Sequence, residues 1–346
     1  MDMAKQYGVF RRRQALAAGY LPHEIDALLD SGEWVRLRQG IYTTRERFDA
    51  ASPYPRNEHL LAGMARRLAM SGDLVISHRS GALHHGIALL DDAPAEPDLT
   101  RHQRRLGRRH TAHDLFLGPV PVAHRVPGWP VVTAARAVAD CGRYLGPDAA
   151  FATIESALYK GLDRAAVEDV LAACAGWPGT RRAMTLLALA DQWSESVLES
   201  LARLWFLEQG LPEPLQQWSV HVGARFLARV DFVWPELRTV CEMDGQVKYA
   251  EDRDRRGETK DGPTTSNRPL WREKLREDGV RDVGLQVVRG YWSDGSDRGA
   301  DLAERLRRAF ARGVAEAGEP AYRLVEPTVR WDRPLDKVGR RRSSAS

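Results

Sequence analysis

The stretch Arg229–Tyr249, RVDFVWPELRTVCEMDGQVKY, constrains the fold of this chain more than any other stretch of the sequence. Apolar and aromatic residues are concentrated in Phe226–Val233, a proline follows, and a second run of extended character comes after it. This pattern predicts a β-hairpin. If the turn is centred on Pro235–Arg238, Trp234 pairs with Thr239.

Three acidic residues interrupt this apolar hairpin. In the predicted register Asp231 lies opposite Glu242, and Asp244 follows on the same face because side chains alternate along a strand. Like charges that face each other destabilise a sheet, so their presence favours a site for a divalent cation. The alternative interpretation is an exposed hairpin whose acids are solvated.

The segments on either side of the hairpin extend the pattern. A helix, SESVLESLARLWFLEQGLPEP, precedes it, and LWREKLREDGVRDVGLQVVRGYW predicts a helix and a last strand after it. Residues Ser194–Phe310 resemble the PD-(D/E)XK nuclease superfamily, most closely the Vsr-like branch related to the very-short-patch repair endonuclease. The resemblance implies a restriction-endonuclease-like α/β/α domain that hydrolyses DNA with Mg²⁺ or Mn²⁺.

The same resemblance implies roles for five residues. Glu199 corresponds to the helical glutamate, and Glu199, Asp231 and Glu242 are the implied metal ligands. Asp244 stands where most of the superfamily has the triplet's lysine, and we expect it to be a further ligand. Lys248 is expected to neutralise charge in the transition state. The alternative is a nuclease fold retained only for binding.

Length and composition fit a globular protein of more than one domain. The chain has 346 residues, 43% of them hydrophobic and 28% charged, with a formal net charge of +4. It has no apolar run long enough to span a bilayer and no signal-peptide apolar region, so we expect a cytoplasmic protein and no membrane partner. The three separated cysteines, Cys141, Cys174 and Cys241, are expected to be small core residues.

The N-terminal segment Gly8–Thr44 predicts two short helices followed by a two-stranded wing. Its sequence, GVFRRRQALAAGYLPHEIDALLDSGEWVRLRQGIY, resembles the winged helix-turn-helix of AbiEi antitoxins from type IV toxin–antitoxin systems. The second helix carries Glu24, Asp26 and Asp30, which repel DNA. DNA contacts are therefore predicted from the cations of the first helix and the wing: Arg11, Arg12, Arg13, Arg36 and Arg38.

A mixed α/β region is predicted next, with a strand at Leu74–Ile76, several helices, and a strand at Val120–Val126 that closes a basic hairpin. Arg136 and Asp140, one helical turn apart, are predicted to form a surface or capping ion pair. The motif SHRSGALHHG and the helices after it resemble the rest of the AbiEi-type module. The spacing of its histidines does not match a known metal motif.

We therefore predict an α+β multidomain protein. A winged helix-turn-helix occupies residues 1–50, an AbiEi-like mixed α/β region 51–190, a Vsr-like endonuclease-like domain 191–315, and a tail 316–346. Two functions stay open: a DNA-binding protein with a metal-dependent endonuclease domain, or a non-enzymatic antitoxin and transcriptional autorepressor with a degenerate nuclease fold. The antitoxin resemblance implies DNA and a nucleotidyltransferase-like toxin as partners.

Overall fold

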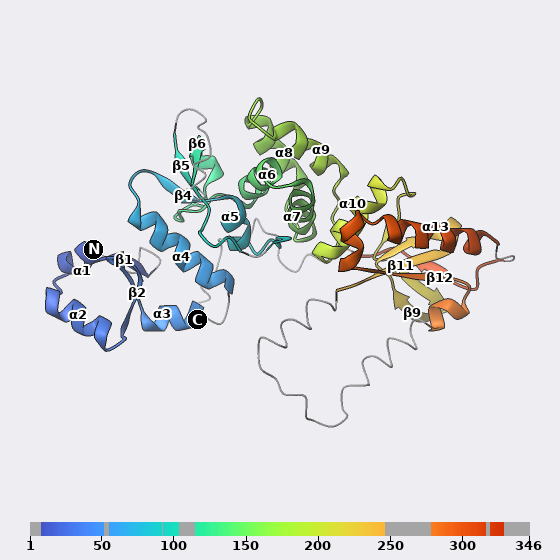
Figure 1. Ribbon diagram of the computed structural model, residues 1–346, viewed down its shortest axis with the longest axis horizontal. Helices are drawn as coiled ribbons and strands as arrows, with labels where there is room; N and C mark the ends of the chain where they lie inside the picture. The colour runs from blue at the N-terminus through green and yellow to red at the C-terminus, as the bar shows by residue number, and fades with distance from the viewer. Residues whose placement is uncertain are drawn as a thin grey trace, which may run out of the picture. The chain divides into compact units, whose positions relative to one another are not determined.

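The computed structural model describes residues 8–51, 55–91, 93–103, 115–245, 278–315 and 319–328. Figure 1 shows the elements coloured along the chain. The chain divides into two units, with the boundary between Ala190 and Asp191. Within the described residues, no helix combines the length and the hydropathy needed to cross a membrane.

The predicted order of two short helices and a wing is confirmed at the N-terminus. The elements are β1 (Val9–Arg11), α1 (Arg12–Ala17), α2 (Pro22–Asp30), β2 (Trp34–Arg38) and β3 (Ile41–Thr44). The wing strands β2 and β3 pair antiparallel, and β1 adds a third strand beside β3.

A small aromatic core holds this N-terminal segment together. The rings of Phe10 and Trp34 meet edge to face with centroids 4.7 Å apart, and Tyr20 meets Trp34 at 5.1 Å. Ile25 of α2 and Tyr42 of β3 complete the cluster, and both are buried. Edge-to-face pairs of this kind stabilise beyond the area that they bury.

Two helices, α3 (Arg45–Ala51) and α4 (Pro55–Ala69), lead to a second sheet in the order β4-β5-β6. Its strands are β4 (Leu74–Ile76), β5 (Leu99–His102) and β6 (Leu115–Gly118). Strand β5 pairs in parallel with β6 and not with Val120–Val126, so the predicted basic hairpin is wrong.

The predicted strand at Val120–Val126 is also wrong. The chain there forms a 3₁₀ turn, Val122–His124. Pro119 and Pro127 flank the segment, and Pro121 lies within it. Because proline lacks the amide N–H that a strand ladder needs, this apolar run cannot pair as an inner strand.

The rest of the first unit is helical, as predicted. The helices are α5 (His78–His84), α6 (Ala134–Tyr144), α7 (Pro147–Tyr159), α8 (Arg164–Ala173) and α9 (Thr180–Leu189). The central helix α6 contacts the other four, and its residues from Ala134 to Arg143 are all buried. Figure 1 shows the other helices gathered around it.

The second unit is built on a four-stranded sheet in the order β12-β11-β10-β7. These strands are β7 (Leu215–Gln216), β10 (Phe232–Trp234), β11 (Thr239–Asp244) and β12 (Gln286–Tyr291). β10 and β11 form the predicted antiparallel hairpin, and Trp234 pairs with Thr239 as expected. β12 lies parallel to β11.

Two helices of the second unit, α10 (Val197–Glu208) and α13 (Ala300–Ala315), pack on this sheet. They cover the face of the sheet that carries Phe232 and Trp234. Phe206 of α10 contacts both rings, at centroid distances of 5.1 and 5.4 Å, and Phe310 of α13 lies 5.0 Å from Trp234.

A three-stranded sheet covers the other face. It consists of β8 (Ser219–Val222), β9 (Arg225–Arg229) and β13 (Arg323–Val325) in the order β13-β8-β9. Val220 and Ala228 of this sheet share an apolar cluster with the hairpin. Because β13 pairs with β8, part of the predicted tail belongs to this unit. All three cysteines are free and buried, which confirms that prediction.

Candidate functional site

Two carboxylates of the second unit come together although they lie on different elements. Glu199 is in the first turn of α10, whose N-cap Ser196 accepts a hydrogen bond from the Glu199 amide, and Asp231 precedes β10. The side-chain amide of Gln217 links them: its Nε2 donates to Glu199 Oε2 at 2.8 Å and to Asp231 Oδ1 at 3.5 Å.

Backbone amides hold both carboxylates in place. The amide of Glu195 donates to Glu199 Oε2 at 2.8 Å, and the amide of Met243 donates to Asp231 Oδ2 at 2.8 Å. The second bond ties Asp231 to strand β11 across the hairpin. These backbone N–H groups orient the two carboxylates, so no cationic side chain is needed to hold them in place.

The pair has unusual proton affinity. Burial and the nearby charge of Asp231 raise the pKa of Glu199 to about 7, and burial raises the pKa of Asp231. The hydrogen bonds from Met243 and Gln217 act in the opposite direction on Asp231. Two close acids that are hard to ionise together favour either a shared proton or a bound cation.

Gln217 is a site residue that sequence analysis missed. Its backbone φ is 58°, in the left-handed region, and its side chain is buried. Its Oε1 atom has no hydrogen-bond partner among the described residues. A neutral glutamine outside the acid pattern gives no signal of this role; only the fold brings it between the two carboxylates.

The other predicted site residues are placed differently. Glu242 aligns with Arg289 of β12, and Asp244 Oδ2 forms an ion pair with Arg289 at 3.4 Å. Extending the hairpin register by one residue puts Glu242 on the same face as Asp231. In the part of the chain that the structure describes, no three His, Cys, Asp or Glu side chains are grouped to hold a metal. Lys248 lies outside the described residues.

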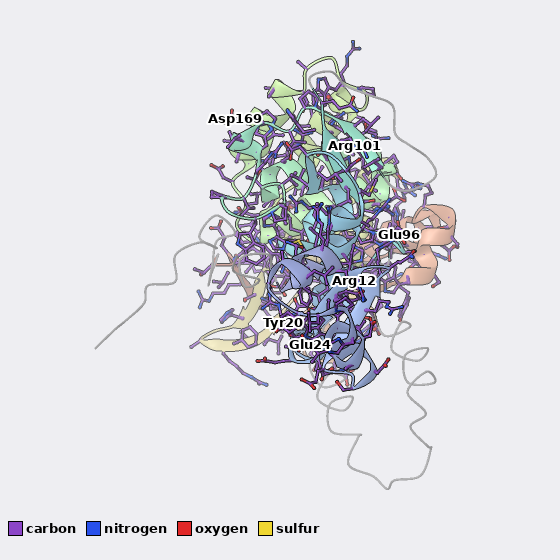
Figure 2. All side chains as sticks on the ribbon, turned by 90° about the vertical axis from the view of Figure 1, so that its left-hand side faces the viewer. Arg12, Tyr20, Glu24, Glu96, Arg101 and Asp169 are labelled. Carbon is purple, nitrogen blue, oxygen red and sulfur yellow. The ribbon has the colours of Figure 1, made fainter. Side chains whose placement is uncertain are left out.

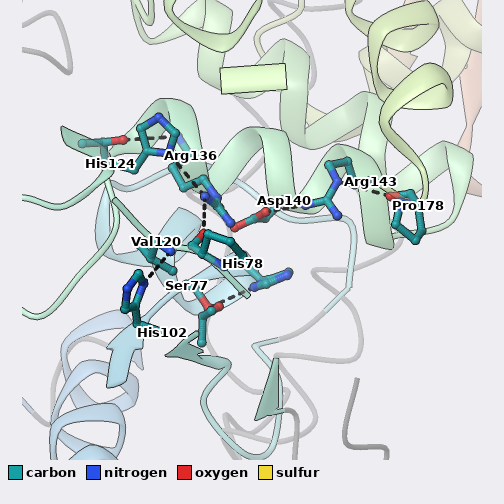
Figure 3. Close-up of polar contacts among 12 residues, drawn as sticks. Ser77, His78, His102, Val120, His124, Arg136, Asp140, Arg143 and Pro178 are labelled. Atoms are coloured by element: carbon teal, nitrogen blue, oxygen red, sulfur yellow. Dashed lines mark hydrogen bonds and ion pairs between the residues drawn. The ribbon is translucent and has the colours of Figure 1, made fainter. Parts of the chain in front are cut away.

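The first unit contains a separate buried polar cluster, drawn in Figure 3. Asp140 Oδ2 accepts from Arg136 Nε at 2.8 Å, and Asp140 Oδ1 accepts from Arg143 Nη1 at 2.9 Å. The prediction of a surface or capping pair is therefore corrected: Arg136 and Asp140 do pair, but both side chains are almost fully buried. A helix surrounded by other helices leaves the pair no access to solvent.

His78 lies next to this cluster. Its ring stacks on Phe116 with centroids 3.4 Å apart, and its Nδ1 lies 2.9 Å from the Ser77 hydroxyl. Burial lowers the pKa of His78 to about 4, against the attraction of Asp140. The ring is therefore neutral near pH 7, and its surroundings indicate a structural role.

The predicted DNA-contacting arginines fall into two groups. Arg12 forms an ion pair with Asp26 at 2.7 Å, Arg38 pairs with Glu96, and Arg11 donates to the carbonyl of Leu68. These three are engaged within the protein. The other two predicted residues, Arg13 and Arg36, are exposed and form no hydrogen bond or ion pair with the described residues.

The acidic face of α2 is partly neutralised. The hydrogen bond from Arg12, aided by the charges of Arg12 and Arg36, lowers the pKa of Asp26. Glu24 accepts from the Leu21 amide at 2.8 Å and remains exposed. Figure 2 labels Arg12 and Glu24 in this segment.

The N-terminal segment is similar to a known protein family. Residues 2–44 match the family described as transcriptional regulator, AbiEi antitoxin. The match contains the two short helices and the wing, and all five predicted arginines lie within it. The AbiEi match ends at the last residue of β3.

Curated relatives extend the similarity beyond the AbiEi segment. Two uncharacterized proteins, from two strains of Mycobacterium tuberculosis, are each 30% identical to the chain over 189 residues. The aligned region covers 54% of this chain and 64% of each relative.

Proposed function

We propose that the chain is a DNA-binding transcriptional regulator of the AbiEi antitoxin type. The observation that carries the proposal is the winged helix formed by the segment that matches the AbiEi family. Its exposed Arg13 and Arg36 form no hydrogen bond or ion pair with the described residues and are available for phosphate, whereas Arg11, Arg12 and Arg38 are held by internal partners. The partner that the antitoxin resemblance implies is a nucleotidyltransferase-like toxin.

Binding to duplex DNA tests this function. The full chain is titrated in gel-shift assays against a duplex from the region upstream of its own gene and a scrambled duplex, at several salt concentrations. Each lost phosphate contact lowers the slope of log affinity against log salt by roughly 1. The double variant Arg13→Ala/Arg36→Ala should therefore bind both duplexes more weakly and with a shallower slope.

The matched control is Arg181→Ala, which removes an exposed arginine outside the matched segment. It should bind as the wild type does. A double variant that keeps both wild-type affinity and wild-type slope would contradict DNA binding through this segment.

A second candidate function is metal-dependent hydrolysis of DNA phosphodiester bonds, favoured by the Glu199–Asp231 pair. The residues fit a hard divalent cation, because two carboxylates and the unpartnered Oε1 of Gln217 offer oxygen donors together. Glu199 and Asp231 would hold Mg²⁺ or Mn²⁺ together with Gln217 Oε1, whereas Glu242 and Asp244 form no three-acid group with them in the described part of the chain. A bound cation of this kind polarises phosphate and supplies hydroxide near neutral pH.

The protein's own contribution to this reaction is to position the acids. The Glu195 and Met243 amides fix the two carboxylates, and Gln217 keeps them together despite their repulsion. Lys248, which lies outside the described residues, is proposed to stabilise charge on the phosphate.

Cleavage and melting measured together test the nuclease proposal. Supercoiled, linear and single-stranded DNA are incubated with the full chain and Mg²⁺ or Mn²⁺. Asp231→Asn should abolish cleavage without loss of the fold, and Lys248→Ala should reduce it in part. A ligand that binds only the native state raises its melting temperature. No cleavage, and a melting temperature that neither cation changes, would leave only the regulator.

A further inference from the structure

A surface groove runs along the helix-turn-helix of the N-terminal segment. It has a volume of about 710 Å³, within the range of roughly 300–1,000 Å³ of pockets that bind ligands. Its lining residues come from the turn, from one side of α2 and from the connection between α2 and the wing: Ala18, Gly19, Tyr20, Glu24, Ala27, Leu28, Ser31 and Glu33.

The α2 residues in the groove form one stripe of the helix. Glu24, Ala27 and Leu28 of α2 and its C-cap Ser31 are spaced three and four residues apart, so they lie above one another. The buried Ile25 faces the aromatic core instead. Leu28, at the edge of the stripe, packs in part against that core, whereas Glu24, Ala27 and Ser31 are exposed.

Small residues make the groove suitable for a close neighbour. Ala18 and Gly19 in the turn and Ala27 on α2 leave room for another backbone, and Tyr20 and Leu28 supply apolar surface. Apolar surface also continues on either side of the turn in the sequence, where Leu16 is 42% exposed and Leu21 is 52% exposed. Apolar side chains that line an open groove indicate an interaction surface.

The charges of the groove select its occupant. Two carboxylates, Glu24 and Glu33, and no cationic side chain are among its lining residues. Both glutamates are exposed, and Figure 2 places Glu24 beside Tyr20. Carboxylates on this face repel the phosphates of DNA and attract lysine or arginine.

We infer that the groove formed by the turn and α2 docks a cationic amphipathic helix of a partner protein. The apolar side of the partner helix lies against Tyr20, Ala27 and Leu28, and its basic residues approach Glu24 and Glu33. This is the helix-in-groove mode of recognition, in which apolar anchors give affinity and charge at the edge gives specificity. The surface is separate from Arg13 and Arg36, so DNA and the partner helix bind through different residues.

A designed peptide tests the groove without knowledge of the natural partner. The probe is a fluorescein-labelled amphipathic helix of leucine, alanine and lysine, and the matched probe has glutamate in place of lysine. Fluorescence anisotropy with the full chain should show binding of the lysine peptide and at least tenfold weaker binding of the glutamate peptide. Equal binding of both peptides, or binding of neither, would overturn the proposal.

Substitutions then locate the binding surface. Ala27→Arg places a large cation in the groove at an exposed helix position and should weaken lysine-peptide binding by roughly tenfold or more. Ala17→Arg makes the same change at an exposed position of α1 outside the groove and should leave binding unchanged. Circular dichroism melting shows whether both variants are folded. Equal peptide affinity in the two folded variants would place the site elsewhere.

Removing the two glutamate charges tests the electrostatic part of peptide binding without filling the groove. The double variant Glu24→Gln/Glu33→Gln keeps the amide oxygen that caps α2, and it should bind the lysine peptide more weakly and with less dependence on salt. If this variant also shows unchanged peptide binding, the electrostatic part of the proposal fails.

The same variants distinguish the partner helix from two other possible occupants of the groove, duplex DNA and a second copy of the chain. Duplex DNA should not displace the peptide, and displacement would make the groove part of the DNA surface. Sedimentation should give the same oligomeric state for Ala27→Arg and the wild type, because a second copy of the chain is not the proposed occupant. Dissociation of a wild-type oligomer by Ala27→Arg would overturn the proposal.

Discussion

At the scale of single residues, Gln217 determines how Glu199 and Asp231 coexist. Without its Nε2 donor, two partly desolvated carboxylates would face each other with only backbone amides and Ser196 to offset their repulsion. The hydrogen bonds to one amide group lower the cost of that repulsion but do not remove it, since burial and charge still raise the pKa of Glu199 to about 7.

The raised pKa of Glu199 predicts a stability that falls as pH rises. Its ordinary pKa is 4.5, so between pH 4.5 and 7 the unfolded chain loses this proton before the folded chain does. Folding is therefore weakened across that window, by a free energy on the order of 1–3 kcal/mol. Glu199→Gln should remove this contribution and be more stable than the wild type at pH 8 in chelator.

Urea unfolding at pH 5 and pH 8 measures the effect, with Glu236→Gln as an exposed control on the same unit. The difference between Glu199→Gln and the wild type should grow with pH, and the control should show no such trend. A constant difference at both pH values would mean that Glu199 does not titrate as described.

His78 predicts the opposite dependence on pH. Burial lowers its pKa from 6.5 to about 4, so its contribution to stability is present above pH 6.5 and is lost as the pH falls toward 4. His78→Asn suits the left-handed backbone there, with φ of 49°, and should be less stable than the wild type at pH 7.5. Its melting temperature should fall less steeply between pH 6.5 and 4.5. His23→Asn, at an exposed position, should keep the wild-type slope.

How much of the site the sequence could predict depends on how far apart in sequence the interacting residues lie. The pairing of Trp234 with Thr239 follows from a local turn, so the positions of Asp231 and Glu242 on the hairpin were predictable. The ion pair of Asp244 with Arg289 and the insertion of Gln217 depend on strands distant in sequence. No local pattern encodes such contacts.

At the scale of elements, the close approach of α6 and α9 depends on Gly179. Its φ is 78°, and a Cβ atom there would lie 2.1 Å from the carbonyl oxygen of Arg143. Gly176, in the same connection, has a φ of 79°, and a Cβ atom there would meet no atom of the described residues within 4 Å. Comparing alanine substitutions at the two glycines therefore distinguishes the cost of backbone strain from the cost of steric overlap.

Gly176→Ala should cost only the left-handed backbone penalty, roughly 1–2 kcal/mol. Gly179→Ala should cost more, roughly 3–5 kcal/mol, because α9 must also move away from α6. Urea unfolding of both variants measures the difference. Equal losses would show that the Arg143 carbonyl shifts without cost.

Elements with a clear period were predictable, and elements that depend on pairing partners were not. Amphipathic stretches such as Asn57–Met70 became helices because one apolar face is enough to specify them. The run Val120–Val126 is as apolar as a strand, but its prolines restrict its pairing to an isolated bridge between Arg125 and Val132. The sequence has no local signal for the parallel pairing of β5 with β6, because parallel strands are connected by a long crossover and not by a tight turn.

At the scale of the whole molecule, each unit has an apolar core of its own. Phe151 is fully buried in the first unit, and Phe232 is fully buried in the second. Units with separate cores can unfold in separate transitions. Truncation of either ring should destabilise its own unit by about 3–5 kcal/mol.

Scanning calorimetry of the full chain therefore should show two transitions. Phe232→Ala should lower one of them and Phe151→Ala the other. The DNA affinity of the AbiEi-matched segment should persist in Phe232→Ala below the first transition. A single transition that both variants lower equally would contradict independent unfolding of the two units.

The parallel pairing of β11 with β12 has a consequence for synthesis on the ribosome. Residues 245–285 separate the two strands in sequence, so the central sheet of the second unit cannot be completed until Tyr291 has left the exit tunnel. The winged helix needs only residues up to Thr44 for its strand pairs. Because N-terminal parts fold first during translation, the nascent chain can present a folded winged helix while Asp231 still awaits the strand that completes its sheet.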